Sequence, residues 1–120
     1  MTQEEKQLLL KDLCARLPYG IKCTTKLTGY NDVYVIQGVY EDNVFIDCPV
    51  YEEGDDEWMI ESIIPFLRPM SSMTDEEKIQ EDNTVLKYLQ DFYNEHYLDY
   101  RGLIPMGLAL EAPEDMYKKD

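Results

Sequence analysis

Few side chains in this 120-residue sequence could act as catalysts. His96 is the only histidine, and the three cysteines are Cys14, Cys23 and Cys48. A cysteine and a histidine can form a nucleophile and base pair wherever a fold brings them together. The pattern instead places Cys14 on the apolar side of a helix and the other two in strands, where cysteine commonly acts as a small buried apolar residue.

The remaining signals also argue against catalysis. His96 falls at the end of a predicted helix, where the helix dipole favours positive charge, so a capping role explains it. The sequence contains no phosphate-binding loop, dinucleotide fingerprint or nucleophile elbow. We therefore predict that the chain is not an enzyme and has no catalytic residue.

Carboxylates are the most abundant candidate ligands. Asp55 and Glu57 alternate beside Gly54, but the spacing does not match a twelve-residue calcium loop. His96 has no histidine or paired cysteine at zinc-ligand spacing. We predict no metal site and no cofactor, and we keep a small-ligand or cation-binding domain as the alternative function.

Negative charge is concentrated in the middle of the chain. The net charge is −14, and residues 51–100 contain 14 acidic against 3 basic side chains. A field of this sign disfavours direct binding to nucleic acid or to an anionic membrane surface. The same carboxylates could instead imitate the phosphates of a nucleic acid, or simply keep the protein soluble. The candidate acidic surface comprises Glu52, Glu53, Asp55, Asp56, Glu57, Glu61, Asp75, Glu76, Glu77, Glu81 and Asp82.

Aromatic residues form a second candidate surface. The sequence has ten tyrosines, a residue with an apolar ring and a polar tip that suits interfaces. The aromatic residues of the predicted second helix are expected to pack on a sheet. The tyrosines of the strand region are harder to bury together, so some of them should be exposed: Tyr30, Tyr34, Tyr40 and Tyr51.

Helical signals occur at both ends. Thr2 and Glu5 match a capping box, and an apolar pattern through Leu10, Leu13, Cys14 and Leu17 predicts a helix over residues 2–17. A second box, formed by Thr74 and Glu77, begins the longest predicted helix, residues 74–97. The second helix should be anchored by Leu86, Leu89 and Tyr93, with a tail over residues 99–113 and fraying over 116–120.

Between the helices, residues 21–27, 33–40 and 44–48 read as strands joined by turns, with Val33 and Val35 on one face and Val39 as a further candidate for it. Residues 58–67 fit a fourth strand or a short helix after Ser62, since Pro65 is tolerated in a first helical turn. The prediction is one α+β domain over residues 1–120. A three- or four-stranded antiparallel sheet should have the N-terminal helix and the long second helix packed on one face.

Three segments resemble a family of small acidic proteins encoded by gut Bacteroidales and their phages or mobile elements. They are residues 4–20, residues 66–74 (FLRPMSSMT) and residues 99–113 (DYRGLIPMGLALEAP). The resemblance implies a cytoplasmic protein of that lineage, and it carries over no activity and no catalytic residue.

The scattered and odd number of cysteines favours reduced thiols, and no apolar stretch is long enough to span a membrane. We therefore expect a cytoplasmic, non-enzymatic protein-interaction module whose partner is another protein. Imitation of nucleic acid is the sharper version of this hypothesis.

Overall fold

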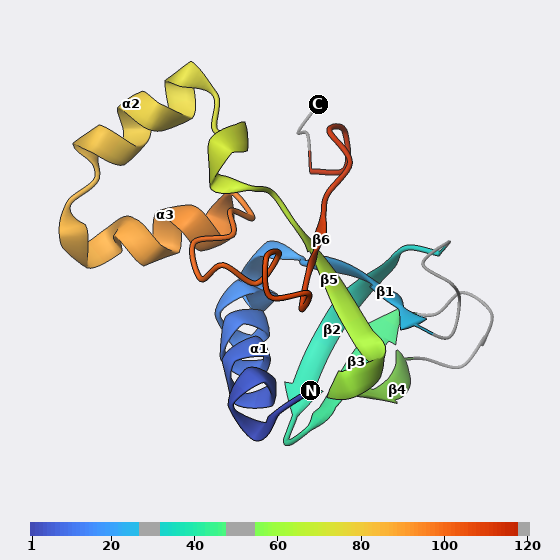
Figure 1. Ribbon diagram of the computed structural model, residues 1–120. Coiled ribbons are helices and arrows are strands. Elements are labelled where there is room, and N and C mark those ends of the chain that lie inside the picture. Colours follow the sequence, from blue (N-terminus) through green and yellow to red (C-terminus); the bar gives the residue numbers. More distant parts are fainter. Residues whose placement is uncertain (27–31, 48–54, 118–120) are drawn as a thin grey trace. The chain divides into compact units, whose positions relative to one another are not determined.

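Figure 1 shows the computed structural model of the chain, which describes residues 1–26, 32–47 and 55–117. The chain forms two compact units, Met1–Phe66 and Leu67–Asp120. Helices and strands occur together, so the predicted α+β class is confirmed. The single domain stays a prediction, because two compact units can still unfold in one step.

Helix α1 (Gln3–Arg16) begins at the predicted capping box. The Thr2 hydroxyl accepts the Glu5 N–H at 3.0 Å, and the Glu5 carboxylate accepts the Thr2 N–H at 2.8 Å. The helix passes into the short 3-10 helix η1 (Leu17–Tyr19) and stops at Gly20, whose φ of 78° is left-handed. The helix at the N-terminus is therefore confirmed.

The buried stripe of α1 is shifted by one residue from the prediction. Its buried members are Leu9, Asp12, Leu13 and Arg16. The spacing has the expected helical period, but the placement of Cys14 on the apolar side is wrong, since Cys14 is exposed. Period alone does not select the face, because Asp12 and Arg16 are buried as an ion pair and do not look apolar in the sequence.

The sheet is larger than predicted. It is a mixed sheet of six strands in the order β4-β3-β2-β1-β5-β6, not a sheet of three or four antiparallel strands. The pairings β1–β2, β1–β5, β2–β3 and β3–β4 are antiparallel. The strands are β1 (Lys22–Thr25), β2 (Tyr34–Tyr40), β3 (Asn43–Asp47), β4 (Asp55–Met59), β5 (Ile63–Leu67) and β6 (Leu110–Glu111).

The two strands absent from the prediction have weak sequence signals. β4 begins with Asp55 and Asp56, which are poor strand formers, and β6 has only two residues. Within the second unit, the Ala112 N–H donates to the Leu67 carbonyl at 2.8 Å.

The inward face of β2 also differs from the prediction. Tyr34 and Ile36 are buried, whereas Val33 is exposed. A bulge lies between Ile36 and Gly38, so Ile36 and Val39 reach the same face although they are three residues apart. Val33 and Val35 share a face by alternation, but the extra residue at the bulge puts Val39 on the opposite face, so the inclusion of Val39 is wrong.

Residues 58–67 adopt the strand alternative. Strand β4 ends at Met59, a 3-10 turn η3 (Ile60–Ser62) follows, and β5 is buried along its whole length. Pro65 lies in β5 opposite Cys23 of β1. A continuous apolar run of five residues suits a strand covered on both faces.

The single long helix predicted over residues 74–97 is wrong. The second unit contains η4 (Met70–Ser72), α2 (Asp75–Asn83), η5 (Leu86–Tyr88) and α3 (Leu89–Glu95). Thr84 and Val85 are extended, and the Thr84 hydroxyl donates to the Gln80 carbonyl at 2.6 Å. Both residues are β-branched, a class that favours extended backbone over helix, and they end α2. The capping box of Thr74 and Glu77 at its start is confirmed.

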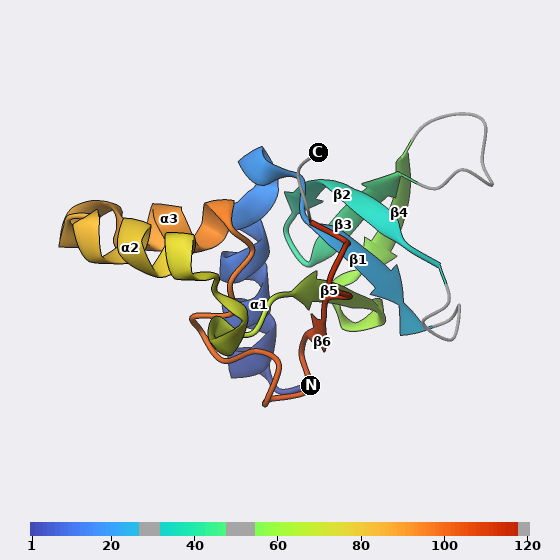
Figure 2. The same cartoon turned by 90° about the horizontal axis from the view of Figure 1, so that it is seen from above.

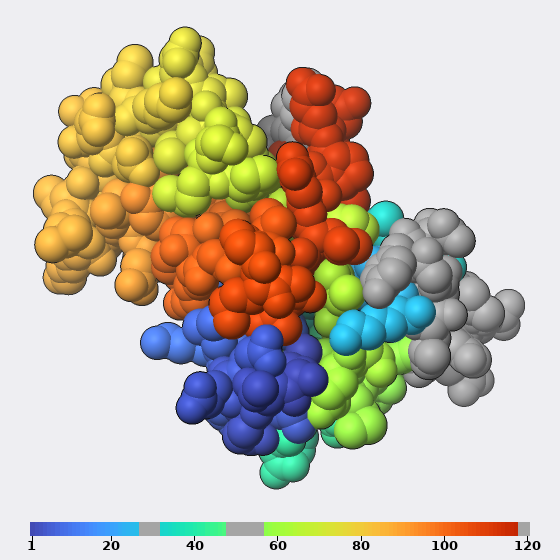
Figure 3. Space-filling model, in the orientation of Figure 1, coloured from blue at the N-terminus to red at the C-terminus, as the bar shows by residue number. Residues whose placement is uncertain are grey.

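The break changes which side chains anchor this segment. Leu86 is 86% exposed, so the prediction that it anchors the helix is wrong. Phe92 is buried, and Leu89 and Tyr93 are half-buried. Figure 3 shows α2 (yellow) and α3 (orange) lying against one another. The Tyr93 hydroxyl donates to the Glu81 carboxylate at 2.7 Å and joins these two helices.

The tail consists of turns and the short strand β6. The Asp99 carboxylate accepts the N–H groups of Leu103 and Ile104 at 2.8 and 2.9 Å. The Tyr117 ring stacks on the Tyr97 ring at 3.8 Å, although fraying was expected from residue 116. Residues 118–120 lie outside the described part of the chain.

Candidate interaction surface

Strands β2, β3 and β4 present one row of side chains to solvent. Tyr40 pairs with Asn43, and Asn43 pairs with Met59, so all three project from the same face of the sheet. Tyr40 is 66% exposed and Met59 is 61% exposed. A large aromatic and a large thioether side chain are thus held on the same exposed face by backbone pairing, one on each side of Asn43.

The next row extends this surface. Phe45 lies opposite Gly38 on one side and Glu57 on the other. Phe45 is half-buried, and Glu57 accepts a hydrogen bond from the Asn43 amide at 2.6 Å. We call this surface the open-face patch, and its members are Tyr40, Asn43, Phe45, Glu57 and Met59.

Helix α1 contacts β2, and the face opposite the open-face patch holds the apolar core of the first unit. Val39, Val44 and Trp58 form the alternate row, and Val44 is fully buried. Figures 1 and 2 both show α1 beside β2. Leu9 and Leu13 of α1 are fully buried. The alternation of the strands therefore sends one set of side chains inward and the open-face patch outward.

Among the four candidate tyrosines, Tyr40 alone is shown to be exposed. Tyr34 is buried, and its hydroxyl donates to the Asp32 carboxylate at 3.4 Å. Tyr30 and Tyr51 lie outside the described residues. Phe45 and Met59 were missed as candidates. The register of the β2–β3 hairpin around the Glu41–Asp42 turn could have placed Phe45 on the same face as Tyr40. Met59 could be placed on that face only once β4 was known to pair with β3.

The acidic candidates of the first unit have different environments. Glu57 is exposed at the open-face patch, and Glu61 forms an ion pair with Lys6 at 2.6 Å. The hydrogen bond from Lys6 lowers the pKa of Glu61. Asp55 and Asp56 are the first two residues of β4, and the structure does not describe their side chains. Glu52 and Glu53 lie outside the described residues.

The acidic candidates of the second unit lie on or near α2. Glu77 is buried and bound to Arg68, and Glu81 accepts the Tyr93 hydroxyl. The others are exposed: Asp75, Glu76 and Asp82. Glu77 therefore serves the internal structure of this unit, whereas the exposed three remain suited to a partner.

The side chains considered as possible catalysts, His96 and Cys23, are held in contacts within the fold. His96 Nδ1 lies 3.1 Å from the Glu77 carboxylate, and the His96 ring contacts Phe92. Cys23 is buried, and desolvation raises the pKa of its thiol to about 12. Cys48 lies outside the described residues. A thiol with so high a pKa is a poor nucleophile near neutral pH.

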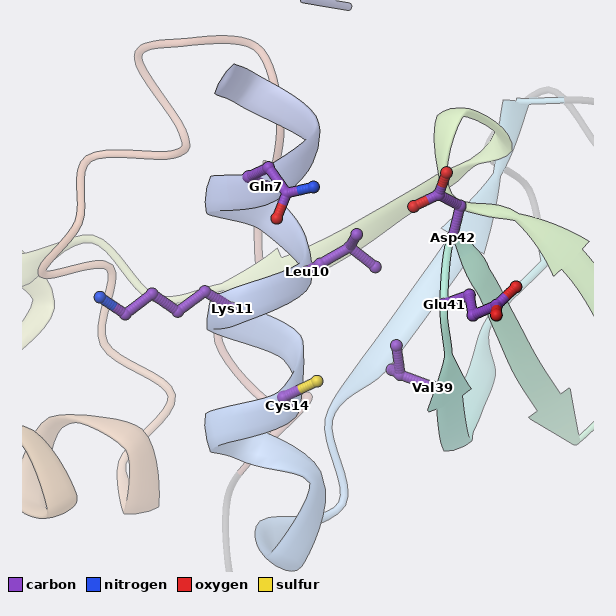
Figure 4. Close-up of a pocket in the computed structure, with 7 residues that line it drawn as sticks. All are labelled: Gln7, Leu10, Lys11, Cys14, Val39, Glu41 and Asp42. Atoms are coloured by element: carbon purple, nitrogen blue, oxygen red, sulfur yellow. The ribbon is translucent and has the colours of Figure 1, made fainter. Parts of the chain in front are cut away.

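A shallow depression of about 400 Å³ lies between α1 and the β2–β3 turn (Figure 4). Leu10 and Cys14 face Val39 across it, and Asp42 lies at its end, while the Lys11 side chain is directed away from the hairpin. Within residues 1–26, 32–47 and 55–117, no group of three or more histidine, cysteine, aspartate or glutamate side chains is placed to hold a metal ion. In the same residues, no helix is long and apolar enough to cross a bilayer.

Comparison of the chain with protein-family models, with curated proteins and with solved structures finds no match.

Proposed function

We propose that this chain is a non-enzymatic protein-interaction module that acts inside the cell and binds its partner through the open-face patch. The observation that carries the proposal is the row Tyr40–Asn43–Met59, in which two large side chains are exposed on one face of three paired strands. Tyrosine and methionine are enriched in protein interfaces, and burying them on association removes apolar area from water.

The charge around the patch indicates the chemistry of the partner. Glu41, Asp47 and Glu57 are exposed on the hairpin and on β4. The first unit as a whole has 13 acidic against 5 basic side chains. A partner with lysine or arginine around an apolar centre complements this surface, and opposite charge accelerates encounter.

Imitation of nucleic acid is the sharper form of this proposal. Such a partner would be a nucleic-acid-binding protein whose basic site accepts carboxylates in place of phosphates. Each unit offers its own exposed acidic groups for this role. They are Asp75, Glu76 and Asp82 in the second unit and Glu57 in the first.

The experiment begins with recovery of the partner from a lysate of the source organism and its identification by mass spectrometry. Affinity is then measured for wild type and for Tyr40→Ser and Met59→Ser. Each replacement should weaken binding about tenfold or more, since each removes a large apolar contact. Val33→Ser is the matched control, because Val33 is 50% exposed and lies outside the patch. Equal losses for the control and the patch variants would contradict the proposal.

Salt dependence tests the acidic component. Binding to a basic partner should weaken as salt rises, and Asp55→Asn/Asp56→Asn/Glu57→Gln should flatten that dependence. A complex that is insensitive both to salt and to this triple replacement would contradict the hypothesis that this segment imitates nucleic acid. The row Tyr40–Asn43–Met59 would then be the binding element.

A small-ligand or cation-binding domain is the second candidate, and the depression beside α1 is the observation that favours it. Titration with Ca²⁺ and with a fragment library, followed by amide chemical shifts, tests it. Shifts confined to Leu10, Cys14 and Val39 would support this function, and their absence would exclude the depression.

A further inference from the structure

Strand β4 stands at one end of the strand order. Its register pairs it with β3 alone among the strands that the structure describes, and Figure 2 shows it next to β3. The last strand of a sheet presents a row of backbone N–H and C=O groups on its outer side, and these groups can pair with an added strand. We call this side of Asp55–Met59 the outer edge of β4.

The register identifies the backbone groups on the outer edge. The Ile60 N–H donates to the Asp42 carbonyl at 2.9 Å, so it points to the β3 side. In an antiparallel pair, the backbone groups of successive residues point alternately toward the neighbouring strand and away from it. The pairing of β3 with β4 runs without a shift up to this point. The N–H and C=O groups of Glu57 and Met59 therefore point outward, and those of Trp58 point to β3.

The outer edge is negatively charged. Three of the five residues of β4 are acidic: Asp55, Asp56 and Glu57. Glu57 is exposed, and so is Asp47, which pairs with Asp55. Opposite charges across paired strands are stabilising, whereas like charges directly opposite one another are destabilising. The outer edge therefore disfavours a second copy of β4 and favours a strand that carries lysine or arginine.

We propose that the outer edge of β4 is a strand-addition site, at which an extended basic segment of a partner protein pairs antiparallel to β4. The proposal rests on the proposed function and deepens it, because Glu57 and Met59 belong to both the open-face patch and the outer edge. The backbone of the segment exchanges hydrogen bonds with these two residues. A basic side chain opposite Glu57 and an apolar side chain opposite Met59 then extend the open face by one strand.

The probe is a peptide of sequence TVVKTKT with blocked ends, whose second and fourth residues lie opposite Met59 and Glu57 in this register. Titration into the isotope-labelled full chain should slow amide hydrogen exchange at Glu57 and Met59. The Ile60 amide should change little, because it is already bonded to the Asp42 carbonyl. Rising salt should weaken the complex.

Two modified peptides separate backbone pairing from charge and apolar contact. N-methylation of the second and fourth residues removes the donors that face β4, so it should weaken binding about tenfold or more. N-methylation of the third and fifth residues is the matched control, because their N–H groups point away from β4. A third peptide, with glutamate in place of both lysines, should not bind.

Met59→Pro tests the outer edge from the side of the protein. The φ of Met59 is −69°, which suits proline, and its N–H points outward, so the replacement keeps the pairing with β3. Met59→Ser is the matched control, since it removes the same thioether and keeps the N–H. Met59→Pro should weaken peptide binding about fivefold or more beyond Met59→Ser. Circular dichroism checks the fold, and the modified peptides decide on wild type if this variant does not fold.

Several results would overturn strand addition: no binding of TVVKTKT at millimolar concentration, equal binding of the two N-methylated peptides, or equal binding of the glutamate peptide. A dimer of the full chain that Met59→Pro dissociates would show that a second copy occupies the outer edge, and would also overturn it.

Failure of strand addition is distinguishable from failure of the proposed function. Tyr40→Ser alters the open-face patch and leaves the backbone of β4 unchanged. If Tyr40→Ser weakens binding of the partner recovered from the lysate while the two N-methylated peptides bind equally, strand addition is wrong and the proposed function stands.

Discussion

The guanidinium of Arg68 donates two hydrogen bonds to the carboxylate of Glu77, at 2.8 and 2.7 Å. The same carboxylate accepts the Thr74 N–H at 2.9 Å and closes the capping box of α2. Arg68 also donates to the carbonyls of Ser72 and His96, at 3.1 and 3.2 Å. One ion pair therefore connects η4, the start of α2 and the end of α3 within the second unit.

Replacing Glu77 with glutamine should destabilise the protein by about 2–3 kcal/mol at neutral pH, since the charge-assisted bonds to Arg68 are lost. These bonds lower the pKa of Glu77 from 4.5 to about 2. A depressed pKa in the folded state means that the ionised carboxylate stabilises folding above about pH 4.5, and that this contribution is lost as the pH falls toward 2. The whole contribution is on the order of 3 kcal/mol.

Chemical denaturation of wild type and Glu77→Gln at several pH values checks this. The difference in unfolding free energy should shrink steadily below pH 4.5. Glu76→Gln is the matched control, because Glu76 is an exposed neighbour on the same helix. A difference that stays constant from neutral to acidic pH would show that the Glu77 carboxylate is not held by Arg68.

Asp12→Ala should cost about 3–5 kcal/mol, because it leaves Arg16 buried without its carboxylate partner. The two side chains are 0% exposed and share two hydrogen bonds, at 2.9 and 3.1 Å. Asp12→Leu/Arg16→Met should cost less than the sum of the two single replacements, since no charge is left buried. Urea denaturation of the set measures this coupling, and strictly additive losses would contradict it.

Native alkylation should distinguish two of the cysteines. Cys14 is exposed, whereas burial raises the pKa of the Cys23 thiol to about 12. At pH 8 the Cys23 thiol is therefore protonated as well as buried, so Cys14 should react with iodoacetamide far faster than Cys23. Peptide mass spectrometry after timed labelling checks the order, with denatured protein as the control for full labelling. A disulfide between these two residues would contradict the prediction that the thiols are reduced.

Phe92 and Leu86 should differ sharply as core positions. Phe92→Ala should destabilise by about 3 kcal/mol, because the ring is buried and contacts Tyr93 and His96. Leu86→Ala should change the unfolding free energy by less than about 0.5 kcal/mol, as expected at an exposed site. Denaturation midpoints of both variants give the comparison, and a large loss for Leu86→Ala would mean that the Leu86 side chain is covered.

The start of each main helix was predictable from sequence. The capping boxes of Thr2 with Glu5 and of Thr74 with Glu77 are present in the structure. Each is formed by groups three residues apart, so its bonds need no distant part of the chain. The β2–β3 hairpin around the Glu41–Asp42 turn was predictable for the same reason.

The alternation of apolar residues in strands and their helical period in α1 predicted whether a segment is a strand or a helix. These patterns did not predict which side of the element is buried. The stripe of α1 lies one residue away from the predicted positions, and the bulge in β2 reverses the expected face. Similarly, Thr84 and Val85 end α2 although the apolar pattern continues to Tyr93. The buried side of α1 and the face of β2 depend on packing partners that are distant in sequence. The end of α2 follows instead from the local preference of two adjacent β-branched residues, which the apolar pattern concealed.

By itself, then, the sequence determined the α+β class, the helix starts, the hairpin and the negative charge. Only the tertiary structure decided that Tyr40 and Met59 share an exposed row, that Leu86 faces water and that Glu77 is held by Arg68. Caps and turns are formed by near neighbours in the chain. The exposure of a side chain depends on which distant strands and helices cover it, and these come together only on folding.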